Sequence, residues 1–186
     1  MKTALLIIDI QNDYFPGGKM ELEESVQAAS AAARLLGAFR REKWPIYHVQ
    51  HVANRPGVGF FIQGSQGADI YEAVRPAADE PVIIKHLPNS FRDTGLLEML
   101  KGEGIKTLLV CGMMTHMCID ATVRAAFDLG FSCTVVHDAC ATRALAFNGN
   151  TVPAKQVQAS FLAALAAVYA QIKGVDDIMQ SLESTH

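Results

Sequence analysis

Short apolar segments alternate with longer segments of helical spacing along this chain. The segment 3–9, TALLIID, is apolar up to its final aspartate, and unbroken apolar runs are typical of strands buried on both faces of a parallel sheet. Similar segments predict strands at 46–52, 81–85, 106–112 and 132–138. The segment 167–175 is ambiguous between a continuing helix and a sixth short strand. We favour the strand because alternate positions are apolar and a glycine follows.

Apolar residues at helical spacing predict helices between these strands, at 22–43, 94–103, 115–130 and 153–166, and a polar helix closes the chain. Strands separated by helices indicate a parallel sheet with right-handed crossovers and helices on both faces. We therefore predict an α/β fold, a Rossmann-like three-layer α/β/α sandwich formed by one domain over residues 1–186. Such sheets bind ligands beyond the carboxyl ends of their strands.

Polar residues mark the carboxyl ends of the predicted strands. Asp9 ends the first and Lys85 ends the third, while Asp138 ends the fifth. Taken singly, Asp9 has an ordinary explanation as a turn or cap residue, and Lys85 has one as a salt-bridge partner. We expect Lys85 to be buried, because the preceding Val-Ile-Ile reads as interior.

Cys118 lies at the start of the helix that follows the fourth strand. Thr115 is a plausible N-cap, which would place Cys118 in the first turn, near the positive end of the helix dipole and near free backbone N–H groups. Both effects are expected to lower the pKa of a thiol and make it nucleophilic. The alternative is a buried, inert cysteine, which is our interpretation of Cys111 and Cys133.

Asp9, Lys85 and Cys118 together suggest a division of labour. The aspartate would act as general base, first on the thiol and later on water. The lysine would keep the aspartate ionised and stabilise the thiolate. The cysteine would attack an electrophilic carbon and form a covalent intermediate. Free N–H groups at the helix start would form an oxyanion hole.

Several motifs in this chain resemble the isochorismatase-like cysteine hydrolase superfamily, which includes nicotinamidase, N-carbamoylsarcosine amidohydrolase and isochorismatase. The resemblance covers nearly the whole chain and rests on DIQNDYFPGG (9–18), Lys85 followed by NSF (89–91), CGMMTHMCIDATVRAAFDLG (111–130) and TVVHDAC (134–140). It implies a six-stranded parallel sheet of order 3-2-1-4-5-6 and an Asp-Lys-Cys triad at Asp9, Lys85 and Cys118. It also implies a cis peptide between Met113 and Met114, with the oxyanion hole formed by the backbone N–H groups of Met114 and Cys118.

The chain departs from the nicotinamidase pattern at its metal-binding motif. Nicotinamidases carry Asp-x-His after the second strand, whereas this chain has YHVQHVANRPG with His48 and His51. Residues three apart lie on opposite sides of a regular strand. We therefore expect no metal and interpret both histidines as ordinary strand-end residues. No glycine-rich phosphate motif follows the first strand, so we expect no cofactor.

The glycine-rich segment 55–70 resembles the substrate-facing loop of the superfamily. Its apolar residues Phe60, Phe61 and Ile62 suggest either a lid on the pocket or a subunit contact, and we favour the pocket. The predicted pocket residues are Asn12, Phe15, Phe60, Phe61, His86, Asn89 and His116. Arg55 and Arg92 are the nearest candidates to bind a substrate carboxylate.

Composition excludes several other functions. The net charge is −3 with no basic stripe, which argues against nucleic-acid binding, and no apolar segment is long enough to span a membrane. The four cysteines form no close pair and no export signal is visible, so we expect reduced thiols in a cytoplasmic protein.

We predict hydrolysis of an amide or ureido C–N bond of a small-molecule substrate through a thioester-type intermediate. The resemblance and the apolar loop also suggest a homo-oligomer, a dimer or a tetramer. Vinyl ether hydrolysis of the isochorismatase type and a non-enzymatic scaffold of the same fold are the alternatives.

Overall fold

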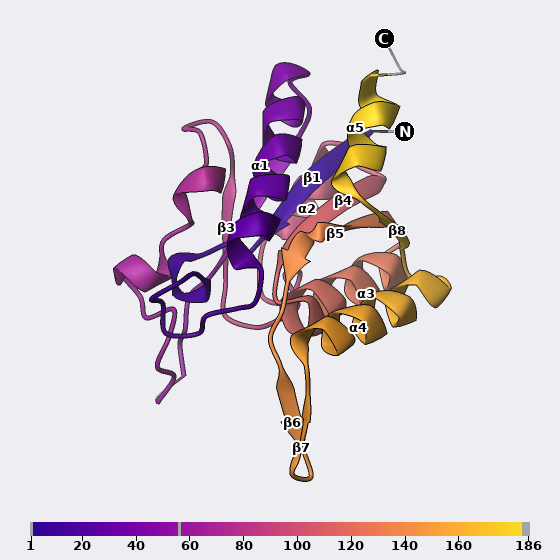
Figure 1. The fold of residues 1–186 in the computed structure, drawn as a ribbon. Coiled ribbons are helices and arrows are strands. Elements are labelled where there is room, and N and C mark those ends of the chain that lie inside the picture. Colours follow the sequence, from indigo (N-terminus) through magenta and orange to yellow (C-terminus); the bar gives the residue numbers. More distant parts are fainter. Residues whose placement is uncertain (1, 56, 184–186) are drawn as a thin grey trace.

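A six-stranded parallel sheet forms the middle layer of the structure, a computed structural model that describes residues 2–55 and 57–183 (Figure 1). The strand order is β3-β2-β1-β4-β5-β8. This confirms the predicted fold class and the expected order, with β8 as the sixth strand of the sheet. The strands are β1 (Thr3–Ile8), β2 (Ile46–His51), β3 (Val82–Lys85), β4 (Thr107–Met113), β5 (Ser132–Ala141) and β8 (Gln171–Lys173).

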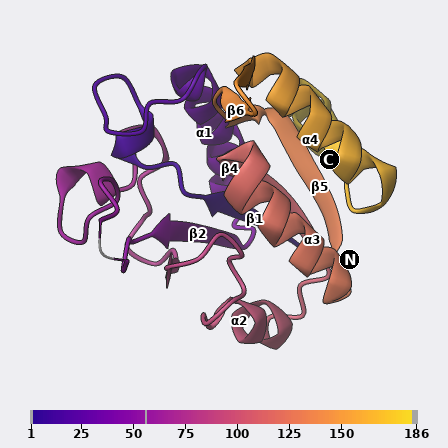
Figure 2. The same cartoon turned by 90° about the horizontal axis from the view of Figure 1, so that it is seen from below.

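Helices cover both faces of this sheet (Figure 2). The two faces have separate cores because side chains alternate along a strand. In β1, Leu5 and Ile7 belong to the core beneath α1 and α5, whereas Leu6 and Ile8 belong to the core beneath α2, α3 and α4. The helices are α1 (Ser25–Arg41), α2 (Leu96–Gly102), α3 (Asp120–Asp128), α4 (Ala154–Val168) and α5 (Val175–Glu183).

The strand that carries Lys85 lies at the edge of the sheet. In β3, Val82 and Ile84 are 40% and 46% exposed, while Ile83 and Lys85 are buried. The expectation that the whole Val-Ile-Ile segment is interior was therefore wrong. An edge strand with one covered face buries only alternate side chains. Lys85 is one of the buried side chains.

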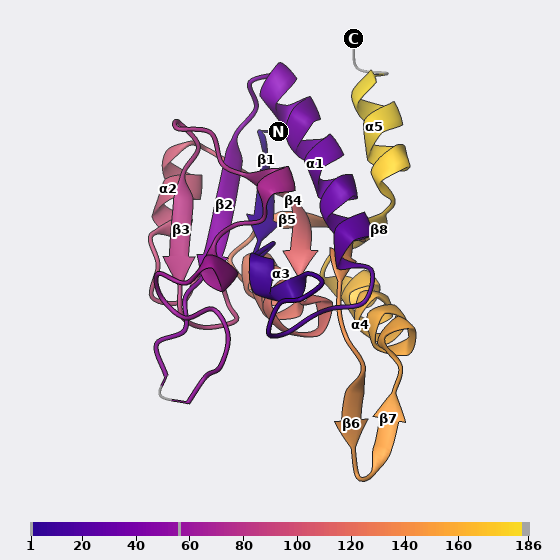
Figure 3. The ribbon, with the colours of Figure 1, turned by 60° about the vertical axis from the view of Figure 1, so that its left-hand side comes forward.

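A two-stranded hairpin that we did not predict projects from the sandwich (Figure 3). It consists of β6 (Leu145–Phe147) and β7 (Asn150–Val152), joined by Asn148 and Gly149. Both turn residues have positive φ angles, 48° and 77°, as a two-residue type I′ turn requires. The Asn-Gly pair between β-prone residues was the available sequence signal. Phe147 is 76% exposed at its end.

Other differences concern the ends of the predicted elements. Helix α4 continues to Val168, so the sixth strand of the sheet is shorter than predicted, and β5 runs on to Ala141. The helix predicted from 115 begins as a π-helical turn, Thr115–Ile119, before α3. Single 3-10 turns lie at Asn12–Tyr14, Gln66–Ala68 and Glu72–Val74. Among the described residues, no helix has the length and apolarity to cross a membrane.

Candidate active site

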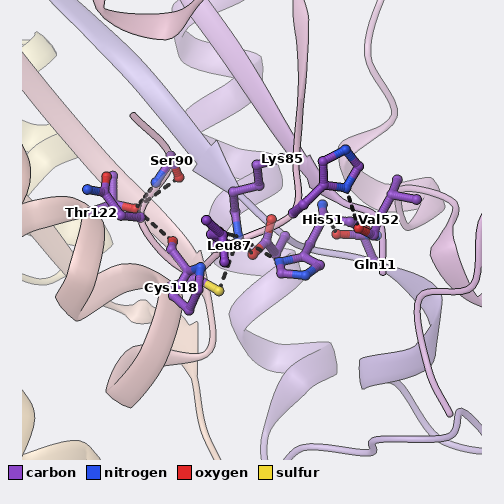
Figure 4. Close-up of polar contacts among 12 residues, drawn as sticks. Gln11, His51, Val52, Lys85, Leu87, Ser90, Cys118 and Thr122 are labelled. Carbon is purple, nitrogen blue, oxygen red and sulfur yellow. Dashed lines mark hydrogen bonds and ion pairs between the residues drawn. The ribbon is translucent and has the colours of Figure 1, made fainter. Parts of the chain in front are cut away.

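The side chains of Asp9, Lys85 and Cys118 meet at the carboxyl end of the sheet. Lys85 Nζ lies 2.7 Å from Asp9 Oδ2. It also lies 3.2 Å from Cys118 Sγ (Figure 4). The side chains of Asp9 and Lys85 have no exposed surface, and Cys118 is 4% exposed. A buried ammonium is thus held between a carboxylate and a sulfur, and the three residues come from β3, the end of β1 and the turn after β4.

Asp9 leaves the sheet with an unusual backbone conformation. Its φ is 51°, which aspartate tolerates better than most residues, and its N–H donates to the Val49 carbonyl oxygen at 3.0 Å. Gly112 in the neighbouring strand lies so close that a Cβ there would be 1.9 Å from the Ile8 carbonyl oxygen. Asp9 Oδ1 is buried and has no hydrogen-bond partner among the described residues. This oxygen is available to a reacting group.

Cys118 is held by the π-helical turn Thr115–Ile119. The residue preceding this turn is Met114, and the peptide bond between Met113 and Met114 is cis. The backbone N–H groups of Met117 and Ile119, on either side of Cys118, both donate to the Met114 carbonyl oxygen. Thr115 is not the N-cap that we expected, because it lies inside the turn and its Oγ1 donates to the Ala141 carbonyl oxygen.

The thiol of Cys118 differs from the expectation of a lowered pKa. Burial raises its pKa well above the ordinary value, the charge of Asp9 raises it further, and the charge of Lys85 lowers it only in part. The expected effect of the helix start was outweighed by desolvation, which disfavours the charged form. The surroundings of the resting sulfur therefore favour the neutral thiol, beside the ion pair of Asp9 and Lys85. The pKa of Lys85 is raised, because the charges of Asp9 and Cys118 outweigh its burial.

His51 is a fourth member of the site that sequence reasoning missed. Its Nδ1 lies 2.9 Å from Lys85 Nζ, and its backbone pairs with Lys85 in the register of β2 and β3. His48 belongs elsewhere, since its Nε2 lies 2.8 Å from Glu80 Oε2. The two histidines lie apart, as their spacing of three residues in the strand predicted. His48 is remote from the site, whereas His51 belongs to it.

One group of possible metal ligands was found among the described residues. A carboxylate oxygen of Asp9, an imidazole nitrogen of His51 and the sulfur of Cys118 lie within 4.8 Å of one another. The ammonium of Lys85 contacts all three residues. It therefore already supplies a cation to this donor set, and a metal ion would have to displace it.

Phe61, which lies in the predicted substrate-facing loop, packs against the site. This side chain is buried, its ring centroid lies 4.7 Å from that of Tyr14 and 5.9 Å from that of His51, and its N–H donates to Asp13 Oδ2 at 2.7 Å. Phe60 is partly buried and lies 5.0 Å from Phe61, ring centre to ring centre. The aromatic residues of this segment thus form an apolar wall beside His51.

Several predicted pocket residues have contacts that serve the local structure. Asn12 Nδ2 donates to the Gln66 carbonyl oxygen, and Asn89 Oδ1 accepts from the Phe91 N–H. Phe15 stacks on Tyr71, with ring centroids 3.5 Å apart. The part of these three residues in substrate binding stays a prediction.

The two histidines predicted to flank the site differ in exposure. His86 is exposed, with Nδ1 2.7 Å from the Val52 carbonyl oxygen, whereas His116 is partly buried and has Nδ1 next to Thr142 Oγ1. Their place in the pocket stays a prediction.

Arg143 is a further charged residue of this region that we did not anticipate. Burial lowers the pKa of His116, and the charge of Arg143 lowers it further. Burial and the charge of Cys118 raise the pKa of the Tyr14 phenol, and the charge of Arg143 opposes them. Arg143 is exposed, and among the described residues its side chain donates one hydrogen bond, to the Met20 sulfur at 3.1 Å, and pairs with no carboxylate. Arg143 follows β5, and a basic residue after a strand end was a signal in the sequence. Arg92, one of the two arginines we named, pairs instead with Asp93.

Comparisons with known proteins identify the family of this chain. The family model of the isochorismatase domain matches residues 3–162. The isochorismatase family protein YddQ of Bacillus subtilis (strain 168) is 51% identical over 180 residues, covering 97% of this chain and all of that protein. Maleamate amidohydrolase of Pseudomonas putida is 30% identical over 156 residues, covering 76% of this chain and 73% of that protein.

The fold is also found in solved structures. A crystal structure from Oleispira antarctica, described as an isochorismatase hydrolase, superposes with a TM-score of 0.92 and 48% identity, over 96% of each chain. Together with the family model, which matches most of the chain, these relatives show that the protein belongs to the isochorismatase-like family of hydrolases.

Proposed function

We propose that the chain is a cysteine hydrolase that cleaves an amide or ureido C–N bond of a small molecule through a thioester-type intermediate. Cys118 is the nucleophile, Asp9 the general base and acid, and Lys85 the fixed cation. One observation carries this proposal: Lys85 Nζ bridges Asp9 Oδ2 and Cys118 Sγ in a site with almost no exposed surface.

The first half of the reaction forms the thioester. Because the pKa of Cys118 is raised, the thiol keeps its proton until a substrate arrives, and the unpartnered Oδ1 of Asp9 can accept it. The sulfur attacks the carbonyl carbon, and the carbonyl electron pair moves to oxygen. The N–H groups of Met114 and Cys118 donate to that oxygen. Asp9 then returns its proton to the nitrogen, the C–N bond breaks and the amine leaves.

The second half consumes water. The Asp9 carboxylate accepts a proton from a water molecule whose oxygen attacks the thioester carbon. The C–S bond breaks, the product leaves as a carboxylic acid, and the sulfur recovers the proton held by Asp9. Lys85 keeps its charge in both halves because its pKa is raised. Its ammonium therefore stabilises every negative charge that forms on sulfur or on the carboxylate.

The relatives support this reaction class. The name of the Pseudomonas putida relative describes hydrolysis of maleamate, an amide. The position of Arg143, without a carboxylate partner among the described residues, supports a substrate that carries a negative charge. The substrate panel should therefore contain matched amides with and without a carboxylate.

The experiment that tests the proposal is release of ammonia from small amides and ureido acids. Wild type is compared with Cys118→Ala and with Cys133→Ala, a matched control because Cys133 is equally buried but lies in β5. We expect release by wild type and by Cys133→Ala, none by Cys118→Ala, and an acid-trapped thioester on the Cys118 peptide in mass spectra. Unchanged release by Cys118→Ala would refute the nucleophile. Consumption of isochorismate without any amide hydrolysis would instead support ether cleavage.

A further inference from the structure

The imidazole of His51 contacts the ammonium of Lys85. Lys85 Nζ has four acceptors in reach: Asp9 Oδ2 at 2.7 Å, His51 Nδ1 at 2.9 Å, the Leu87 carbonyl oxygen at 3.1 Å and Cys118 Sγ at 3.2 Å. An ammonium has three N–H donors and no acceptor. Three N–H groups cannot serve all four partners at once, but none of the partners can donate to the ammonium. A proton on Nδ1 of His51 would point at the ammonium across 2.9 Å, so Nδ1 must be without a proton.

The pKa of His51 agrees with an Nδ1 that carries no proton. Burial and the charge of Lys85 lower the pKa of His51 to about 4, with smaller contributions from His86 and Arg55, while the charge of Asp9 opposes them. The imidazole is thus neutral near pH 7. Because Nδ1 accepts from the ammonium, the single ring proton lies on Nε2.

The backbone of His51 is held on both sides by one buried side chain. Gln11 Oε1 accepts from the His51 N–H at 2.8 Å, and Gln11 Nε2 donates to the His51 carbonyl oxygen at 2.9 Å and to the Ala68 carbonyl oxygen at 2.7 Å. Gln11 has no exposed surface. The ring of Phe61 lies beside the imidazole. His51 is therefore a fixed acceptor and not a mobile side chain that meets the lysine by chance.

We propose that His51 is a positioning residue, a neutral imidazole whose Nδ1 aims the Lys85 ammonium between Asp9 and Cys118. The proposal rests on the function proposed above, because it assigns His51 to the same site. In this proposal His51 acts through its hydrogen bond to Lys85 and not as a metal ligand. The ammonium already contacts Asp9, His51 and Cys118, the three residues that could otherwise hold a metal ion.

The first test needs no substrate. In ¹⁵N-labelled protein, NMR should show the Nε2–H tautomer of His51, with no titration from about pH 8 down to about pH 5.5. In Lys85→Met the pKa of His51 should rise, because the charge of Lys85 lowers it in wild type. An Nδ1–H tautomer, or a pKa that Lys85→Met leaves unchanged, would overturn the proposal whatever the substrate proves to be.

The second test compares two substitutions of His51. His51→Asn carries a side-chain oxygen near the position of Nδ1, whereas His51→Leu has similar bulk and no acceptor. Loss of a hydrogen bond to a charged group should lower the kcat of His51→Leu about tenfold to a hundredfold, with KM changed by less than about threefold. His51→Asn should recover most of the loss. Equal kcat values for wild type and His51→Leu, or equal losses in both variants, would contradict the proposal.

Elemental analysis separates positioning from metal binding. Wild type purified without chelators should contain no stoichiometric zinc. Zinc that is present in wild type and lost in His51→Leu would make His51 a ligand and would overturn the proposal. Since the NMR and zinc measurements are independent of turnover, failure of the hydrolase proposal would be seen separately, as absence of amide hydrolysis with the His51 contact intact.

Discussion

Asp9 Oδ2 and Lys85 Nζ form a 2.7 Å ion pair in which neither side chain has exposed surface. Removal of one member leaves the other charge buried without compensation. We expect Lys85→Met to lower the free energy of unfolding by about 3–5 kcal/mol, and the double variant Asp9→Asn/Lys85→Met to recover a large part of it. Urea unfolding of wild type, Lys85→Met and the double variant measures both values. Equal losses in the single and double variants would show that the pair is not the cause.

The thiol of Cys118 should respond to its neighbours in opposite directions. Because Asp9 raises its pKa and Lys85 lowers it, Asp9→Asn should lower the thiol pKa and speed alkylation by iodoacetamide near neutral pH, although turnover is abolished. Lys85→Met should slow alkylation. Cys118→Ala lacks this thiol and therefore shows which part of the measured alkylation comes from Cys118. Slower alkylation in Asp9→Asn would mean that Asp9 activates the resting thiol rather than suppressing its ionisation.

The lowered pKa of His51 gives the protein a characteristic pH dependence of stability. His51 is neutral in the folded protein down to about pH 4, whereas in the unfolded chain it gains a proton below about pH 6.5. The unfolded chain therefore binds more protons in this window, and the free energy of unfolding falls as the pH falls through it.

His51→Asn has no titrating ring and should show a shallower fall between the same limits. Urea unfolding at a series of pH values checks this difference. The carboxyl of Glu80, whose pKa is lowered to about 2 mainly by hydrogen bonds from Arg40, the Ala77 N–H and His48 against its burial, acts at lower pH. Its contribution is present above about pH 4.5 and is lost below it, so the two windows can be separated.

The contact between Gly67 and Asp13 should be sensitive to one methyl group. A Cβ on Gly67 would lie 2.2 Å from Asp13 Oδ1, and Asp13 also accepts from the Phe61 N–H. We expect Gly67→Ala to displace Asp13, cost about 1–3 kcal/mol and lower activity by loosening the aromatic wall. Gly59→Ala is the control, because nothing lies within 4 Å of its Cβ. Equal stability of the two variants would contradict this interpretation.

The exposed end of the hairpin should contribute little to folding. Phe147 is 76% exposed, so Phe147→Ser should change the free energy of unfolding by less than about 0.5 kcal/mol. Light scattering of wild type and of this variant also tests the homo-oligomer expected from the sequence. A monomeric wild type at micromolar concentration would refute that expectation, and a monomeric variant of an oligomeric wild type would place the hairpin in the subunit contact.

The sequence predicted the sheet and the three central residues because their signals are local. Asp9 and Lys85 each follow an apolar run, and Cys118 follows a strand and opens a helix. The carboxyl ends of parallel strands meet at one edge, so strand ends alone were enough to bring these residues together.

The remaining features depended on contacts between distant segments. His51 looked like a strand-end residue because its role follows from the pairing of β2 with β3, which places it opposite Lys85. The raised pKa of Cys118 could not be read from a helix start, since it arises from burial and from Asp9, more than 100 residues away in the chain. The hairpin was different, because its Asn-Gly turn was visible in the sequence.

The edge position of β3 has a consequence for heat inactivation. The strand is four residues long, and Lys85 is its last residue. Outer strands separate from a sheet at a lower free energy than its centre. Fraying of this strand would withdraw the ammonium while the other five strands stay paired. Heating should therefore inactivate the protein below the temperature of global unfolding. Activity should be lost at temperatures where the backbone N–H groups of β1 and β4 are still protected from hydrogen exchange.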